Sequence, residues 1–215
     1  MKYYLLNLSL FSLLLSACGA PVQTQIYPHL LSLQSSDAGF ETLPVKPRNF
    51  TIEYPDSGEL NQYGSVSDLL FYLSVQETVD GHMSEQLALT NVMIPAYPGA
   101  EDELDDNVAN ALVIALDAWM QDEELTGVIT SQQLVTWHGL PTLEIQATAD
   151  PITADLTDGG DAYLVRALAV YPEDLQSDNG LIILMLTDPT YSDIDSFADF
   201  DQSGTISKIL STISF

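Results

Sequence analysis

The segment Leu181-Ile182-Ile183-Leu184-Met185-Leu186 decides the fold class, because it is apolar at every position. A strand without alternation between apolar and polar residues is buried on both faces and belongs in the middle of a covered sheet. We therefore expect a central strand over residues 181–186, with other elements packed on both faces of its sheet.

Outward from this run, shorter patterns predict the remaining strands. Phe50-Thr51-Ile52-Glu53-Tyr54 alternates apolar and polar residues and stops at Pro55. Asp80-Gly81 is a favoured hairpin turn, and Gly139-Leu140-Pro141 separates two further strand patterns. Besides residues 50–54, strands are expected over residues 69–78, 87–94, 128–130, 134–138, 143–148 and 162–171. Neighbours joined by such turns form a mostly antiparallel sheet.

Two segments have the spacing of amphipathic helices. Over residues 102–122 the apolar positions recur every three or four residues, which places them on one stripe that could pack on the central strand. The stripe consists of Leu104, Val108, Ala111, Leu112, Ala115, Leu116 and Trp119. A second pattern, Ile206, Ile209, Leu210 and Ile213, closes the chain. The fold class expected is α+β, a mostly antiparallel sheet flanked by helices.

The charge balance excludes two classes of partner. The 215 residues include 31 acids and 5 Lys or Arg, a formal net charge of −26. Non-specific binding to nucleic acid or to an anionic membrane surface requires a basic patch, so we expect neither. The acids are scattered, which is typical of a solvated, self-repelling surface; a basic partner or cation binding is the alternative.

The first residues have the features of an export signal. Lys2 precedes an apolar run over residues 5–15, which has the length of a signal-peptide core. Leu15-Ser16-Ala17-Cys18 resembles a bacterial lipobox. We expect residues 1–17 to be a lipoprotein signal peptide and Cys18 to carry diacylglyceryl and an amide-linked acyl chain such as palmitate. An ordinary signal peptide with a chance cysteine is the alternative.

A lipid on Cys18 would hold the protein on a membrane despite its acidity, because three acyl chains bind essentially permanently. Gly19 resembles an outer-membrane address, so we expect the periplasmic face of the outer membrane, with the inner membrane or cell surface as alternatives. Residues 18–49 contain four prolines and are expected to be a tether reaching about 100 Å, within which residues 30–33 are apolar enough to dock. Residues 50–215 form the single expected domain.

Three segments together resemble a known group. They are Phe50-Thr51-Ile52-Glu53-Tyr54-Pro55, Trp137-His138-Gly139-Leu140-Pro141-Thr142-Leu143-Glu144 and Ile209-Leu210-Ser211-Thr212-Ile213-Ser214-Phe215. With an acidic helix between the first two, this order resembles the PsbP-like α/β/α sandwich, which includes DcrB-like and LpqN-like bacterial envelope lipoproteins. The resemblance covers residues 50–215. It implies an antiparallel sheet with helices on its faces, usually without a catalytic site, and branches with unrelated binding or assembly roles.

The residues offer few catalytic groups. The single cysteine is Cys18, which excludes a disulfide framework and a cysteine zinc cluster. His29 lies in the expected tether, while His82 and His138 lie at expected turns. The chain has no Gly-x-Ser-x-Gly or His-Glu-x-x-His motif. We expect no catalytic residue and no cofactor; a hydrolase built on paired carboxylates is the alternative.

Two polar features, Arg166 and the segment 199–206, each have two possible interpretations. Arg166 is the one base in the middle of the domain, and it predicts either an ion pair across the sheet or a site for an anionic ligand. Residues 199–206 resemble the first eight positions of a calcium-binding EF-hand loop, with Asp199, Asp201 and Ser203 as weak candidate ligands. Position 12 of such a loop needs glutamate, and Leu210 stands there, so a helix-capping loop is the preferred interpretation.

The function expected from these residues is that of a lipid-anchored envelope protein acting as a non-catalytic binding or assembly module. Its partner would be an envelope protein of unknown identity. A calcium-responsive envelope protein using the loop over residues 199–206 is one alternative, and the carboxylate hydrolase is the other.

Overall fold

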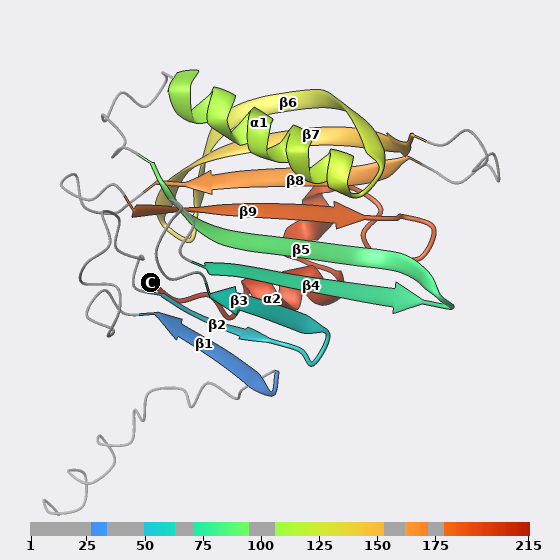
Figure 1. Ribbon diagram of the computed structural model, residues 1–215, viewed down its shortest axis with the longest axis horizontal. Coiled ribbons are helices and arrows are strands. Elements are labelled where there is room, and N and C mark those ends of the chain that lie inside the picture. Colours follow the sequence, from blue (N-terminus) through green and yellow to red (C-terminus); the bar gives the residue numbers. More distant parts are fainter. Residues whose placement is uncertain (1–26, 34–49, 63–70, 95–105, 153–161, 172–178) are drawn as a thin grey trace, which may run out of the picture.

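The computed structural model describes residues 27–33, 50–62, 71–94, 106–152, 162–171 and 179–215 (Figure 1). In chain order the strands are β1 (His29–Leu33), β2 (Phe50–Tyr54), β3 (Gly58–Gln62), β4 (Phe71–Val79), β5 (His82–Met93), β6 (Leu125–Trp137), β7 (Leu140–Pro151), β8 (Tyr163–Val170) and β9 (Asn179–Thr187). The helices are α1 (Asp106–Asp122), the 3₁₀ helix η1 (Phe197–Asp201) and α2 (Gly204–Leu210). None of the helices in these ranges is both long and apolar enough to span a bilayer.

Seven strands form one sheet in the order β3-β4-β5-β9-β8-β7-β6, and every neighbouring pair is antiparallel. The apolar run of residues 181–186 lies in β9, the middle strand, and each of its side chains is buried. The prediction of a central strand covered on both faces is therefore confirmed. The expected fold class, a mostly antiparallel sheet flanked by helices, is also confirmed.

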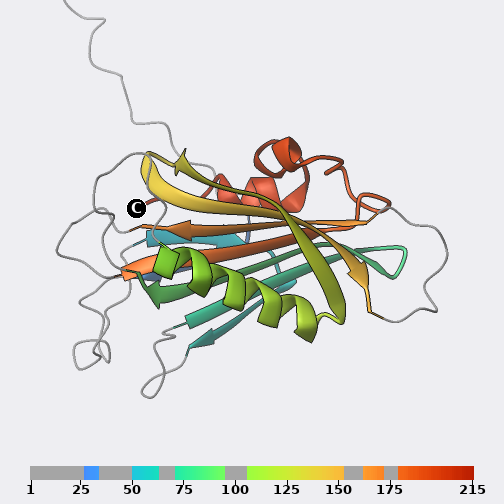
Figure 2. The same ribbon diagram turned by 90° about the horizontal axis from the view of Figure 1, so that it is seen from above.

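One face of the sheet is covered by α1 (Figure 2). Leu112 and Leu116 are fully buried there and belong to the same apolar cluster as Leu184 of β9, as the helix stripe predicted. The stripe itself needs a correction, because Ala111 is exposed while Ala109 and Met120 are buried. Residues 102–105 of the expected helix lie outside the described residues.

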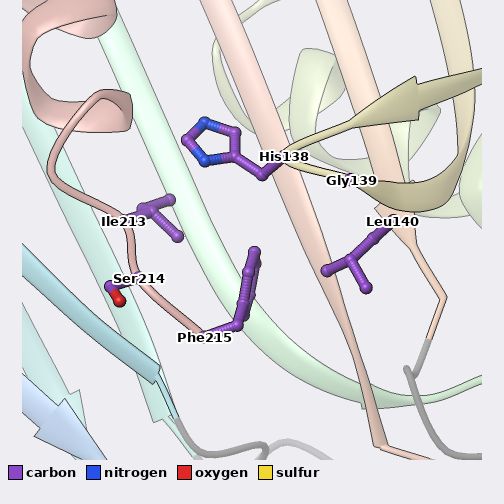
Figure 3. Close-up of a pocket in the computed structure, with 6 residues that line it drawn as sticks. All are labelled: His138, Gly139, Leu140, Ile213, Ser214 and Phe215. Atoms are coloured by element: carbon purple, nitrogen blue, oxygen red, sulfur yellow. The ribbon is translucent and has the colours of Figure 1, made fainter.

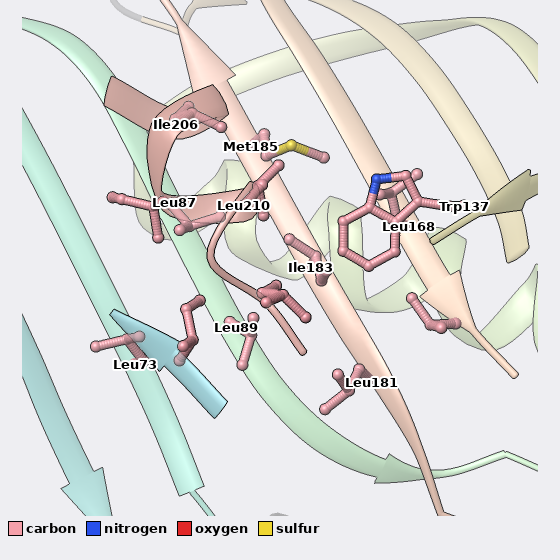
Figure 4. Packing of buried hydrophobic residues seen from close by; sticks show 14 of the residues in the cluster. Leu73, Leu87, Leu89, Trp137, Leu168, Leu181, Ile183, Met185, Ile206 and Leu210 are labelled. Atoms are coloured by element: carbon pink, nitrogen blue, oxygen red, sulfur yellow. The ribbon is translucent and has the colours of Figure 1, made fainter. Parts of the chain in front are cut away.

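The opposite face is covered by α2, η1 and a separate two-stranded sheet formed by β1 and β2. In Figure 4 the side chains of Ile206 and Leu210 from α2 lie over those of Leu87 and Met185 from the sheet. Residues 30–33 do dock, as expected, because Leu31 of β1 is buried in this cluster. Ile213 lies beyond the end of α2 but is still buried.

Several strand boundaries differ from the sequence-based expectation. The segments 128–130 and 134–137 belong to one continuous strand, β6, with a bulge between Ile129 and Ser131, while His138, expected in the strand, lies in the turn. Strand β5 begins at His82, five residues earlier than predicted, because pairing resumes directly after the turn. Strand β3 was not predicted. The glycine-rich segment 158–161 lies outside the described residues.

Candidate functional site

A pocket lies where the β6–β7 hairpin turn meets the C-terminal segment. Its lining residues are His138, Gly139 and Leu140 from the hairpin, and Ile213, Ser214 and Phe215 from the segment after α2. Its volume is about 370 Å³. Figure 3 shows the side chains of His138, Ile213, Phe215 and Leu140 arranged around this hollow.

The hairpin side of the pocket is fixed by a two-residue turn. His138 has φ of 51° and Gly139 has φ of 81°, so both turn residues are left-handed, as in the tight turns that match the twist of paired strands. Trp137 and Leu140 pair on either side of the turn, and both side chains are buried. The hairpin predicted at Gly139 is confirmed, but its turn consists of His138 and Gly139, whereas Leu140 and Pro141 already belong to β7. The turn presents the exposed His138 ring at the pocket.

The other side of the pocket is held by backbone pairing to β2. The amide of Thr51 donates to the carbonyl of Ser214 at 2.8 Å, and the amide of Ser214 donates to the carbonyl of Thr51 at 3.1 Å. Ile213 is buried in the core directly before this pair, while Phe215 directly after it is partly exposed. The pocket is thus built from segments about 75 residues apart in the sequence, held in place by two different sheets.

Two aromatic rings, those of His138 and Phe215, line this pocket, and both contact the buried ring of Trp137. The rings of Trp137 and His138 are 4.2 Å apart at an angle of 57°. Phe215 approaches both edge-on, with its ring centroid 6.4 Å from that of Trp137 and 6.5 Å from that of His138. The solvent-open lining of the pocket is more polar than apolar. It therefore suits a small ring that carries hydrogen-bonding atoms, because such a ring can contact the exposed rings and also reach the polar groups.

A buried ionic network lies on the same sheet face as the pocket. Nε of Arg166 on β8 lies 2.5 Å from Oε1 of Glu144 on β7, and Nη1 lies 2.8 Å from Oδ1 of Asp201 in η1. Burial alone lowers the pKa of Arg166, but the interactions with Asp201 and Glu144 outweigh that effect and raise the pKa. The guanidinium is therefore charged and neutralised. Of the two interpretations of Arg166, the structure bears out the ion pair across the sheet.

The candidate calcium ligands do not converge. Oδ2 of Asp199 accepts a hydrogen bond from Ser196, Asp201 pairs with Arg166, and the side chain of Ser203 makes no capping bond. Within the residues that the structure describes, no group of three or more His, Cys, Asp or Glu side chains is placed to hold a metal ion. The oxygens at positions 1, 3 and 5 of the calcium-like pattern thus have separate surroundings.

The residue that caps α2 comes from outside the loop. Oε2 of Glu85 on β5 accepts hydrogen bonds from the amides of Thr205 and Ile206, each at 2.8 Å, and Oε1 accepts one from the hydroxyl of Ser192. The capping predicted for this loop is present, but the cap is Glu85 rather than an Asp or Ser of the loop. No local pattern in the sequence indicates a partner 120 residues away.

The remaining histidines have contacts away from the pocket. His29 lies in β1, where its Nε2 is 2.8 Å from Oδ1 of Asp56 and its ring stacks on Tyr54. His82 begins β5 and stacks on Tyr191, with ring centroids 4.4 Å apart. Among the predicted site residues, Cys18 lies outside the described residues. The pocket was not predicted, although its turn and its closing segment were both singled out in the sequence.

No family model matches the sequence, and no curated protein matches it. Among solved structures, the chain is similar to cyanobacterial PsbP (CyanoP) from Synechocystis sp. PCC 6803, with 11% identity over 93% of this chain and 98% of that chain and a TM-score of 0.44. It is also similar to PA94 from Pseudomonas aeruginosa, described as a protein of unknown function and putative regulator, with 12% identity over 65% and 78% of the two chains and a TM-score of 0.29.

Proposed function

We propose that this protein is a lipid-anchored bacterial envelope protein that acts as a non-catalytic binding module and holds its ligand in the pocket beside His138. The pocket is the observation that carries the proposal. The two backbone segments that line it are held by the hairpin turn and by the pairing of Ser214 with Thr51, so a ligand would meet a preformed backbone.

The buried charges support binding rather than catalysis. Arg166 is neutralised by Glu144 and Asp201, and Glu85 is committed to the amides at the start of α2. A catalytic centre usually holds charged groups ready for substrate, with pKa values matched to the reaction. Here these groups connect elements of the fold. We assign them to stability and assign ligand contact to the pocket.

The pocket is tested by binding of small aromatic probes. Indole and phenol, each with one aromatic ring system and one hydrogen-bond donor, match its chemistry, and their binding is followed by chemical-shift changes in the nuclear magnetic resonance spectrum. We expect the amides of residues 138–140 and 213–215 to shift, and His138→Ala to weaken binding. His82→Ala is the matched control, because this exposed histidine stacks on Tyr191 outside the pocket. Equal binding by both variants, or shifts elsewhere, contradicts the proposal.

The anchor is tested separately through Cys18. In the proposal the acyl chains supply membrane binding while the acidic domain opposes it. The Cys18→Ala variant should therefore leave the membrane fraction or remain unprocessed, whereas Cys18→Ala protein that stays in membranes after a high-salt wash rules out the lipid anchor. Crosslinking of the anchored protein in intact envelopes, followed by purification, then identifies the partner. Loss of that partner in Phe215→Ala connects it to the pocket.

A further inference from the structure

Strand β6 forms one edge of the seven-stranded sheet, and in the described part of the chain no strand pairs with its outer side (Figure 1). It has 13 residues, whereas β3 at the other edge has 5. An edge strand presents a row of backbone donors and acceptors that a further strand can use. A long edge provides a long template.

The usual protection of such an edge is weak in β6. Natural edge strands carry charges, prolines or bulges, or are very short. The sequence of β6, LTGVITSQQLVTW, has no charged residue and no proline, although the chain has 31 acids and 5 bases. One bulge, between Ile129 and Ser131, is present. Beside it Val128 is 69% exposed and Ile129 is 39% exposed, so apolar side chains stand in water along this edge.

The two ends of β6 differ in charge. Asp122 and Glu124 precede the strand and are exposed, and the exposed Asp150 of β7 pairs with Thr126 near the same end. The other end runs into Trp137 and the turn at His138, where the lining residues of the pocket include no Asp or Glu side chain. A ligand strand lying along β6 would therefore experience a negative potential at one end.

We propose that β6 accepts an extended segment of a partner protein as an eighth strand, and that this segment carries Lys or Arg at its C-terminal end. Every neighbouring pair in the sheet is antiparallel, and an antiparallel strand beside β6 ends next to Leu125. Its last residues then lie near Asp122, Glu124 and Asp150. Main-chain hydrogen bonds supply the affinity, and the charged end sets the direction.

A second copy of this chain fits the edge less well. Its own β6 carries no base to meet the acidic end, and a net charge of −26 on each copy opposes their approach. The occupant is therefore a different protein with a basic extended segment. This strand site is separate from the pocket and goes beyond the proposed function, because it requires neither the lipid nor the His138 ring.

The experiment uses two peptides of identical composition with acetylated and amidated ends. The first is Thr-Val-Thr-Val-Thr-Val-Thr-Lys-Lys, and the second carries the two lysines at its beginning. Binding is measured by isothermal calorimetry at low salt, and hydrogen exchange locates the protected amides. We expect the first peptide to bind roughly five- to tenfold more tightly than the second, the size expected for two exposed charge pairs, and to protect residues 125–137.

Two triple variants isolate the charge effect without touching the strand. Neutralising the acidic end, Asp122→Asn with Glu124→Gln and Asp150→Asn, should abolish the preference between the peptides. Neutralising three exposed acids elsewhere, Glu59→Gln with Asp193→Asn and Asp195→Asn, should preserve it. Equal binding of both peptides to the wild-type protein, protection outside β6, a preference for the second peptide, or a dimer whose β6 is already protected would each overturn the proposal.

Discussion

The carboxylate of Glu85 occupies the space that a side chain on Gly204 would need. A Cβ built on Gly204 would overlap both carboxylate oxygens, and Gly204 also has φ of 75°, a left-handed conformation that glycine adopts without strain. Gly204, which resembled position 6 of a calcium loop, is thus needed because a larger residue there would displace Glu85 of β5. This relationship ties the first turn of α2 to the middle of the sheet.

Gly204→Ala should therefore destabilise the fold by two effects. The left-handed backbone costs about 1–2 kcal/mol with a Cβ, and displacement of Glu85 from the amides of Thr205 and Ile206 adds about 1–3 kcal/mol. Urea denaturation measures the sum. Gly139→Ala is the matched control, since Gly139 has φ of 81° with nothing near its missing Cβ, and it should show the backbone cost alone. Equal losses for both variants would mean that the Glu85 contact does not matter.

The two acids around Arg166 should contribute unequally. The side chain of Glu144 is 5% exposed and that of Asp201 is 46% exposed, although both contact the same guanidinium. We expect Glu144→Gln to reduce the free energy of unfolding by about 3–5 kcal/mol, because the charge of Arg166 loses its buried partner. Asp201→Asn should cost about 1 kcal/mol or less, since water screens that pair. Thermal unfolding of both variants checks the order, and a larger loss for Asp201→Asn would contradict it.

Calcium should bind no more tightly than millimolar. Asp201 is already paired with Arg166, Asp199 with Ser196, and Leu210 replaces the glutamate that completes an EF-hand loop. Calorimetric titration with calcium should therefore show no saturable site in the micromolar range. A micromolar site that disappears in Asp201→Ala would instead support the calcium-responsive alternative.

Stability should fall as the pH rises above about 10, the ordinary pKa of tyrosine. Burial raises the pKa of Tyr163, and the charge of Asp188 and the neighbouring Tyr191 raise it further. Burial also raises the pKa of Tyr27, and the charges of Glu77 and Glu85 add to this effect. A phenol whose pKa is higher in the folded state favours folding below the unfolded pKa, and this contribution is lost as the pH rises through the folded value.

The free energy of unfolding at about pH 9 and about pH 11 measures this effect. Tyr163→Phe should reduce the fall between the two values, because phenylalanine does not ionise. An undiminished fall in Tyr163→Phe would show that other groups cause the alkaline loss.

The sequence predicted the parts of this fold that depend on local patterning. Residues 181–186 are all apolar, so a strand formed by them presents apolar side chains on both faces, and its central position could be inferred. The alternation in residues 50–54 and the turn residues at Gly81 and Gly139 are equally local. The residues between the two predicted segments, 131–133, are Ser-Gln-Gln, which have no apolar member to continue the alternation, so one strand was expected as two segments.

The site depends on contacts between distant segments, and these leave no local trace. Glu85 is one of 31 acids, and its role at α2 follows from the strand order rather than from its neighbours in the sequence. The ion pair of Arg166 was predictable because a lone base on a buried strand needs a carboxylate. Its partners Glu144 and Asp201 could not be chosen from the sequence, and the pocket required both sheets to be in place.

The docking of β1 sets the length of the tether between a lipid on Cys18 and the folded body. The amide of Tyr27 donates to Glu53 and His29 pairs with Tyr54, so the body of the protein is reached 9 residues after Cys18, whereas β2 begins 32 residues after it. Fully extended, the shorter distance along the chain corresponds to about 30 Å, and the longer one to about 110 Å. If residues 29–33 detached, the body could travel more than twice as far from the bilayer. Docking or release of this one strand would thus set how far from the membrane the protein can contact a partner.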